Sequence, residues 1–207
     1  MKKLVDIKNF IHKNMFERFI KEKNPAVCVT GNFDITNIYR LKSKHCFNTL
    51  MCYCITKAAQ KIDEFHYSID ENNQLYYYQD VKTNFAVTGN DGELYWADCK
   101  YCDGFEEFEK EYEKGRDYCF KNCEYYKADT GALISTSAVV NFPFTAFSID
   151  NSDIFWDSFL LWGKYVLNND KVNISITLRF HHAIMGAQHA GMFFEQLQKE
   201  FDNFVLG

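Results

Sequence analysis

The hydrophobic pattern of this chain is clearest in two helices and one strand. Apolar residues recur at spacings of three and four from residue 47 to 62 and again from 187 to 204, which is typical of helices with one buried face. The apolar residues of the strand alternate with polar ones and are Val172, Ile174, Ile176, Leu178 and Phe180. The pattern therefore predicts a half-buried strand shortly before the second helix.

In the rest of the chain, weaker periodicity and turn residues predict short strands and two more helices. The helices are predicted over 10–23, ending before Pro25, and over the acidic segment 104–121. The strands are predicted over 26–34, 66–69, 74–79, 83–89, 132–142 and 159–167, with turns at 70–73 and 168–171. This order predicts an α/β fold: a two-layer sandwich with a mixed, mainly antiparallel sheet covered by helices. Without a linker or repeat, 1–207 is expected to form a single domain.

The charge and hydropathy of the chain exclude two classes of partner. With 23 Lys and Arg against 28 Asp and Glu, the chain does not supply the concentrated positive field that a nucleic acid requires. No stretch approaches the roughly 18 uninterrupted apolar residues of a membrane span, and the first ten residues carry charges where a signal peptide would be apolar. We therefore expect a cytoplasmic protein that binds neither nucleic acid nor membrane.

The cysteines are then expected to be reduced thiols. Three of the eight fall among expected core residues and are Cys28, Cys52 and Cys54. Four others have a spacing close to that of a zinc site and are Cys99, Cys102, Cys119 and Cys123. The acidic helix between the two pairs is too long for a zinc knuckle. We interpret these four as surface cysteines beside a helix and predict no metal site, with zinc as the alternative.

A pair of histidines joins the strand to the last helix, in the segment HHAIMGAQHAG at 181–191. Continuing the alternation of the strand by two residues puts His182 on its buried side. Burial disfavours the charged form of an imidazole, so His182 is expected to be neutral near pH 7 and able to accept a proton, as a general base must. The alternative is a core histidine with both ring nitrogens hydrogen-bonded.

The motifs around this pair resemble those of the chloramphenicol acetyltransferase family over nearly the whole chain. The family pattern HHxxxDG matches HHAIMGA at 181–187, and FTAFSID at 144–150 stands where the family commonly has FTSFDLN. The segment LLWGKYV at 160–166 corresponds to FTMGKYY. The resemblance implies a homotrimer with its active sites between subunits. The resemblance further implies that His182 deprotonates a hydroxyl group of the acceptor and that this hydroxyl oxygen attacks the thioester of acetyl-CoA.

Several residues depart from the family pattern. The Asp and Gly that end the motif are replaced by Gly186 and Ala187, and His12 stands where the resemblance implies the arginine that pairs with that Asp. Loss of both partners leaves no buried charge without its counter-ion. Ala146 replaces the serine credited with stabilising the oxyanion, which leaves Thr145 as the neighbouring hydroxyl. Removal of such a donor typically costs about 2.7–4 kcal/mol of transition-state stabilisation.

Two functions follow from this comparison. The first is an acetyl-CoA-dependent O-acetyltransferase with His182 as base, acting on chloramphenicol or another hydroxylated small molecule with altered or weakened activity. The second is a trimeric binding protein that holds a small ligand or haem in the former acceptor pocket, with His182 as ligand and with His189 or a cysteine able to contribute. We otherwise interpret His189 as structural. The pocket wall is expected to include Phe19, Phe33, Phe144, Ala146, Phe147 and Gly186.

Overall fold

The computed structural model describes residues 1–128, 131–149 and 157–206 and is built on one large mixed sheet. Its strands, in spatial order, are β2 (Ala26–Asp34), β10 (Lys171–His181), β8 (Ser158–Trp162), β7 (Ala132–Ala138), β5 (Val81–Thr88) and β6 (Leu94–Cys99). A further strand, β9 (Val166–Asn168), pairs with the start of β10. The pairs β5–β7 and β7–β8 are parallel and the others are antiparallel. The predicted mixed, mainly antiparallel sheet is therefore confirmed.

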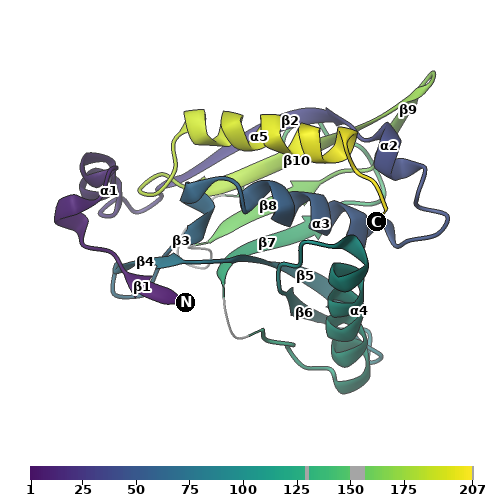
Figure 1. Cartoon of the computed structure of the whole chain (residues 1–207), viewed down its shortest axis with the longest axis horizontal. Coiled ribbons are helices and arrows are strands. Elements are labelled where there is room, and N and C mark those ends of the chain that lie inside the picture. Colours follow the sequence, from purple (N-terminus) through teal and green to yellow (C-terminus); the bar gives the residue numbers. More distant parts are fainter. Residues whose placement is uncertain (129–130, 150–156, 207) are drawn as a thin grey trace.

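Three helices cover one face of this sheet (Figure 1). They are α3 (Phe47–Ala59), α4 (Phe105–Asn122) and α5 (Ala187–Asp202). Helix α3 lies between the other two and is buried on nearly all sides, whereas α5 buries one stripe that includes Phe193, Leu197 and Phe201. Each fully buried apolar side chain of this size stabilises the fold by about 1.5–3 kcal/mol. The α/β two-layer arrangement is confirmed.

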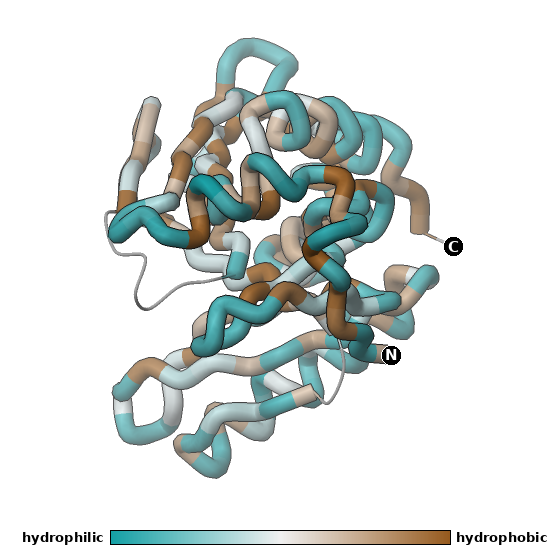
Figure 2. The backbone as a smooth tube through the Cα atoms, turned by 90° about the vertical axis from the view of Figure 1, so that its left-hand side faces the viewer, coloured by the Kyte–Doolittle hydropathy of each residue, from teal (hydrophilic) through white to brown (hydrophobic). Residues whose placement is uncertain are grey.

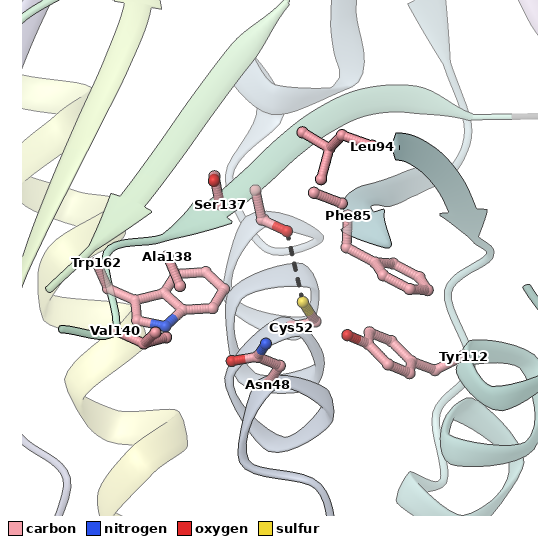
Figure 3. A pocket seen from close by; sticks show the side chains of 11 residues that line it. Asn48, Cys52, Phe85, Leu94, Tyr112, Ser137, Ala138, Val140 and Trp162 are labelled. Carbon is pink, nitrogen blue, oxygen red and sulfur yellow. Dashed lines mark hydrogen bonds between the residues drawn. The ribbon is translucent and has the colours of Figure 1, made fainter. Parts of the chain in front are cut away.

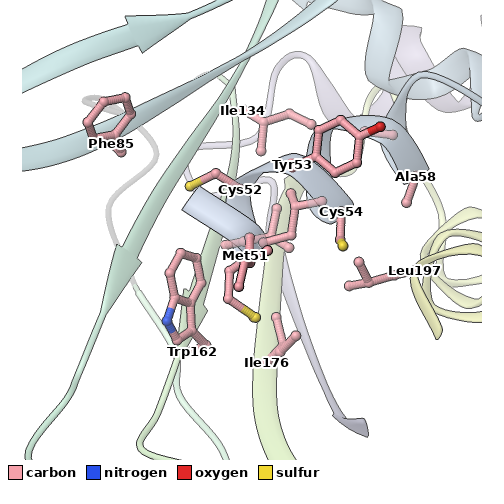
Figure 4. Close-up of a cluster of buried hydrophobic side chains, with 14 of the residues drawn as sticks. Met51, Cys52, Tyr53, Cys54, Ala58, Phe85, Ile134, Trp162, Ile176 and Leu197 are labelled. Carbon is pink, nitrogen blue, oxygen red and sulfur yellow. The ribbon is translucent and has the colours of Figure 1, made fainter. Parts of the chain in front are cut away.

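The main core lies between these helices and the sheet (Figure 4). Met51, Cys52 and Cys54 of α3 are fully buried there, as are Ile134 of β7 and Ile176 of β10. Figure 2 shows hydrophobic segments gathered within the molecule and hydrophilic ones along the outer turns. None of the helices in the described part of the chain has the length and hydropathy of a membrane span.

A smaller layer lies beside the end of β10. It consists of a three-stranded sheet in the order β1 (Lys2–Leu4), β4 (Leu75–Tyr78) and β3 (Tyr67–Ile69), together with the short helices η1 (Ile7–Asn9), α1 (Lys13–Phe19) and η2 (Asp63–His66). Its own core joins Phe10 and Phe16 to Ala183 and Ile184, which directly follow the histidine pair. This packing fixes the loop between β10 and α5.

Strand β6 carries a buried carboxylate, that of Asp98. Asp98 is almost completely buried, and its oxygens contact Lys82 Nζ at 2.6 Å and accept hydrogen bonds from Asn84 Nδ2, Tyr125 Oη and the N–H of Ala128. A buried charge is tolerated only with such partners. The network ties the segment after α4 to the sheet.

The sequence prediction differs from the structure at several elements. The strand predicted over 159–167 is two strands, because the ring of Phe144 lies against Gly163, where a Cβ would come 2.9 Å from Phe144 Cδ1. The helix predicted over 10–23 is limited to α1. The strands β1 and β6 and the short helix α2 (Thr36–Tyr39) were not predicted.

Candidate functional site

The histidine pair lies where β10 ends. The ladder between β10 and β2 runs to His181, and the N–H of His182 continues it by donating to the carbonyl of Pro25 at 2.8 Å. The chain then turns, because the N–H groups of Ile184 and Met185 both donate to the carbonyl of His181. The segment between β10 and α5 lies at the end of the sheet, beside α1 (Figure 1), and the His182 ring stacks there on Phe19 of α1.

The hydrogen bond of His182 determines which ring nitrogen carries the proton. Nδ1 lies 3.0 Å from the carbonyl oxygen of Met185, and a carbonyl only accepts, so Nδ1 carries the hydrogen of the neutral ring. Nε2 then has the lone pair. The Phe19 ring stacks on the imidazole with centroids 4.0 Å apart and planes inclined by 25°, which fixes the plane of the ring. The arrangement presents an oriented proton acceptor.

The burial of the pair differs from the prediction. His182 is half-buried, whereas His181 is 5 % exposed and lies on the opposite side of β10. Burial, with Arg179 nearby, lowers the pKa of His181 to about 4, so its ring is neutral at physiological pH. Its Nδ1 accepts a hydrogen bond from the N–H of Ala183 at 3.1 Å. The desolvated imidazole is therefore His181, and His182 retains a path to solvent because the chain turns at the strand end.

The loop expected to face the base lies at the other end of the sheet. Its Phe144 packs against Gly163, whose N–H donates to the carbonyl of Ser175. At ~3.3 Å per residue, the seven positions from Ser175 to His182 span about 23 Å along β10. Thr145 and Ala146 are exposed on this loop, and the ring of Phe147 lies 6.2 Å from that of Phe144. A single chain therefore does not bring Thr145 and His182 together.

Of the remaining predicted pocket residues, Phe19 contacts His182, and Phe33 does not. Phe33 is 3 % exposed and packs edge-to-face on Phe194 and Phe201 beneath α5, so its role in the core accounts for its position. Gly186 precedes the first turn of α5, and a Cβ there would meet only Met15 Sδ at 4.0 Å. A Cβ at this position would therefore meet no clash.

A carboxylate that was not predicted lies close to this turn. Glu64 of η2 accepts from His12 Nε2 at 3.0 Å and faces His189 Nε2 at 3.5 Å. No local motif marks Glu64, which is 52 residues from His12 in sequence. In the described ranges, these three residues are the one group of potential metal ligands whose atoms lie within 4.8 Å of one another.

The protonation of His189 argues against a metal in this group. Its Nδ1 accepts from the N–H of Gly186 at 3.1 Å, so the proton of the neutral ring is on Nε2, facing Glu64. A metal at Nε2 would require that proton to leave, whereas ligating histidines normally keep a proton on the other nitrogen. The group is therefore better described as a hydrogen-bonded cluster.

The four cysteines with zinc-like spacing do not form a joint ligand set in the described chain. Three are buried and not on the surface as predicted, namely Cys99, Cys102 and Cys119. Burial raises the pKa of Cys102 to about 11, and the Cys119 thiol donates to the carbonyl of Trp96. Cys123 donates to Asn90 Oδ1. As predicted, Cys52 and Cys54 are core residues, whereas Cys28 is half-buried.

A cavity of about 330 Å³ opens at the end of the sheet that is remote from His182 (Figure 3). Asn48 and Cys52 of α3, Tyr112 of α4 and Trp162 of β8 line it, and Cys52 Sγ lies 3.5 Å from Thr136 Oγ1. Val140 also lines the cavity and belongs to the segment that leads to Phe144. The cavity thus adjoins the loop of Thr145.

Comparison with known proteins agrees with this architecture. Residues 2–198 match the family described as chloramphenicol acetyltransferase. The chain is 26 % identical over 213 residues to a chloramphenicol acetyltransferase of Clostridium perfringens, covering 97 % of this chain and 95 % of that protein. It is 24 % identical over 209 residues to chloramphenicol acetyltransferase 3 of Escherichia coli, covering 94 % of each.

Solved structures share the fold. A chloramphenicol acetyltransferase superposes with a TM-score of 0.82 at 22 % identity, covering 96 % of this chain and 99 % of the other. A dihydrolipoamide acetyltransferase of Azotobacter vinelandii has a TM-score of 0.69 at 16 % identity, covering 93 % and 87 %. These matches give no support to the haem alternative. Since the family match spans nearly the whole sequence, this chain belongs to the chloramphenicol acetyltransferase family of acyltransferases.

Proposed function

We propose that this protein is an acetyl-CoA-dependent O-acetyltransferase that acts on a hydroxyl group of a small molecule, chloramphenicol or another acceptor, with His182 as the general base. Nε2 of His182 takes the hydroxyl proton, and the oxygen bonds to the thioester carbonyl carbon. The tetrahedral intermediate then breaks its C–S bond. The departing thiolate of CoA takes the proton back from the imidazole, which restores the neutral base.

The observation that carries this proposal is the state of the His182 ring. The Met185 carbonyl holds the proton on Nδ1, and the Phe19 ring supports one face, which leaves the lone pair of Nε2 as acceptor. Half-burial lets a substrate reach the ring while reducing competition from water. A histidine with both nitrogens satisfied, such as His66 between the carbonyls of Gln60 and Tyr78, has no such acceptor.

The ~23 Å of β10 between Ser175, beside which the Thr145 loop packs through Gly163, and His182 supports a site shared by two copies. In a homotrimer with threefold symmetry, the surface around His182 of each copy would contact the surface around the Thr145 loop of the next copy. Three such contacts close the ring and form three equivalent sites. The cavity lined by Tyr112 and Trp162 adjoins that loop and provides an aromatic wall for the acceptor. In this arrangement Thr145 is the hydroxyl available for the oxyanion, next to Ala146.

The activity is tested by following CoA release with a thiol reagent over a panel of hydroxylated acceptors that includes chloramphenicol. We expect turnover with at least one acceptor and its loss in His182→Ala. The matched control is His45→Ala, because His45 is half-buried like His182 but lies near α4, away from the proposed base. Absence of turnover with every acceptor would contradict the proposal.

The shared site is tested by mixing two inactive variants. His182→Ala lacks the base, and Ala146→Trp blocks the loop, so neither homotrimer should be active. In a fully exchanged equimolar mixture, about a quarter of all sites would combine an intact base with an intact loop from a neighbouring copy, and about that fraction of wild-type turnover should return. Inactivity of the mixture, with mixed trimers demonstrated by mass spectrometry, would show that each copy builds its own site.

A further inference from the structure

The peptide group between Met185 and Gly186 has an imidazole at each end. Its carbonyl accepts from His182 Nδ1 at 3.0 Å, and its N–H donates to His189 Nδ1 at 3.1 Å. A trans peptide is planar, with its C=O and N–H pointing in opposite directions, so the two imidazoles hold opposite edges of one rigid plane. Any rotation of this plane that breaks the bond to His189 also turns the carbonyl away from His182.

His189 is itself held by Glu64. With Nδ1 accepting from Gly186, the proton of His189 lies on Nε2 and faces Glu64 Oε1 at 3.5 Å. The carboxylate favours this tautomer. In the other one, the proton on Nδ1 would face the N–H of Gly186, and the unprotonated Nε2 would face the negative charge of Glu64. Glu64 thereby selects the form of His189 that can hold the peptide.

His12 contacts the same oxygen of the carboxylate as His189 does. Its Nε2 donates to Glu64 Oε1 at 3.0 Å, and its ring lies 4.9 Å from that of His189. The Glu64 side chain is 12 % exposed, so water competes weakly for its oxygens. Three elements far apart in sequence, the residue before α1, helix η2 and the first turn of α5, therefore converge on one carboxylate.

We propose that Glu64 and His189 are positioning residues for the base: through the Met185–Gly186 peptide they fix the orientation and tautomer of His182. This inference rests on the proposed function of His182. The cluster takes the place of the arginine and aspartate that the sequence resemblance leads one to expect at residues 12 and 186. Hydrogen bonds or a short electrostatic contact connect Glu64 to His189, His189 to the peptide, and the peptide to His182. The Glu64 carboxylate therefore polarises each of these groups in turn.

The kinetic test compares Glu64→Gln with Glu109→Gln. Glu109 contacts His45 Nδ1 at 2.8 Å and is similarly buried, but it has no connection to His182. We expect kcat to fall about 10- to 100-fold in Glu64→Gln, the range that loss of orientation produces, with KM for both substrates within about twofold. Glu109→Gln should retain wild-type kinetics. Equal kcat in both variants would overturn the proposal.

A second pair of variants separates positioning from folding. In His189→Asn, Oδ1 stands where Nδ1 stood and can still accept from the N–H of Gly186, whereas His189→Ala removes that acceptor. We expect kcat to be lowered in both variants and to be at least about fivefold higher in His189→Asn, which retains the hold on the peptide. Equal kcat in these variants, with equal melting temperatures, would show that His189 does not act through the peptide.

The tautomer of His182 provides a readout that does not depend on turnover. Long-range ¹H–¹⁵N NMR correlations distinguish a protonated from an unprotonated ring nitrogen, with His182→Ala giving the assignment. Wild type should show the proton on Nδ1, and Glu64→Gln a mixture of tautomers. If no acceptor is acetylated, the proposed function fails while this spectrum still tests the positioning role; an unchanged His182 spectrum in Glu64→Gln would refute that role.

Discussion

Replacement of His181 by asparagine should flatten the dependence of stability on pH. The His181 pKa is lowered from 6.5 to about 4 in the folded chain by burial and by Arg179. The neutral form is thus favoured by folding, so this stability is fully present above about pH 6.5 and is lost as the pH falls toward 4. A difference of about 2.5 pKa units corresponds to about 3 kcal/mol of unfolding free energy. Asparagine does not titrate, and its Oδ1 can accept from Ala183 as Nδ1 does.

The measurement is urea unfolding of wild type and His181→Asn at about pH 7.5 and about pH 4, followed by circular dichroism at one fixed protomer concentration. The smaller side chain lowers stability at both pH values, and this contribution cancels when the two losses are compared. We expect wild type to lose about 3 kcal/mol more than the variant between the two pH values. Losses that agree within about 1 kcal/mol would refute the assignment of a low pKa to His181.

Three further predictions concern the site and the sheet. Phe19→Ala removes the ring stacked on His182 and should lower kcat about tenfold at an unchanged KM for acetyl-CoA; a change in KM alone would contradict an orienting role. Ala146→Ser adds a donor on the exposed loop and should raise kcat about 100-fold, provided that the loop faces the oxyanion; no increase, in protein of wild-type stability, would exclude that placement. Lys82→Met leaves the buried Asp98 without its cation and should lower the unfolding free energy by about 3–5 kcal/mol in urea titrations, whereas a loss below about 1 kcal/mol would show that the neutral donors suffice.

Elements with strong local periodicity were predicted from the sequence, and those defined by their neighbours were not. Strand β2 and helices α3, α4 and α5 agree with their predicted segments to within three residues at either end, because apolar spacing within one segment determines which face can be buried. Strand β6 has no clear alternation and forms through its ladder with β5. The interruption of the strand predicted over 159–167 depends on the approach of Phe144 to Gly163, which are distant in sequence.

The candidate site divides in the same way. Short motifs in the sequence were enough to predict the histidine pair at the end of a strand and the family of the chain. They also showed that Gly186 stands where the family has an aspartate. The exchange of burial between His181 and His182 was not predicted, because β10 is buried on both faces from Ile176 to His181, where alternation no longer separates a buried face from an exposed one.

Glu64 shows most clearly what the sequence alone does not determine. Nothing in the segment around it indicates that it meets His12 and His189, and the loop of Thr145 gives no sign that it lies at the opposite end of the sheet from His182. Local spacing decides which residues form a helix or strand, because hydrogen bonds and side-chain packing within an element involve near neighbours. Which distant side chains meet is decided by strand order and by packing between layers, and only the tertiary structure determines these.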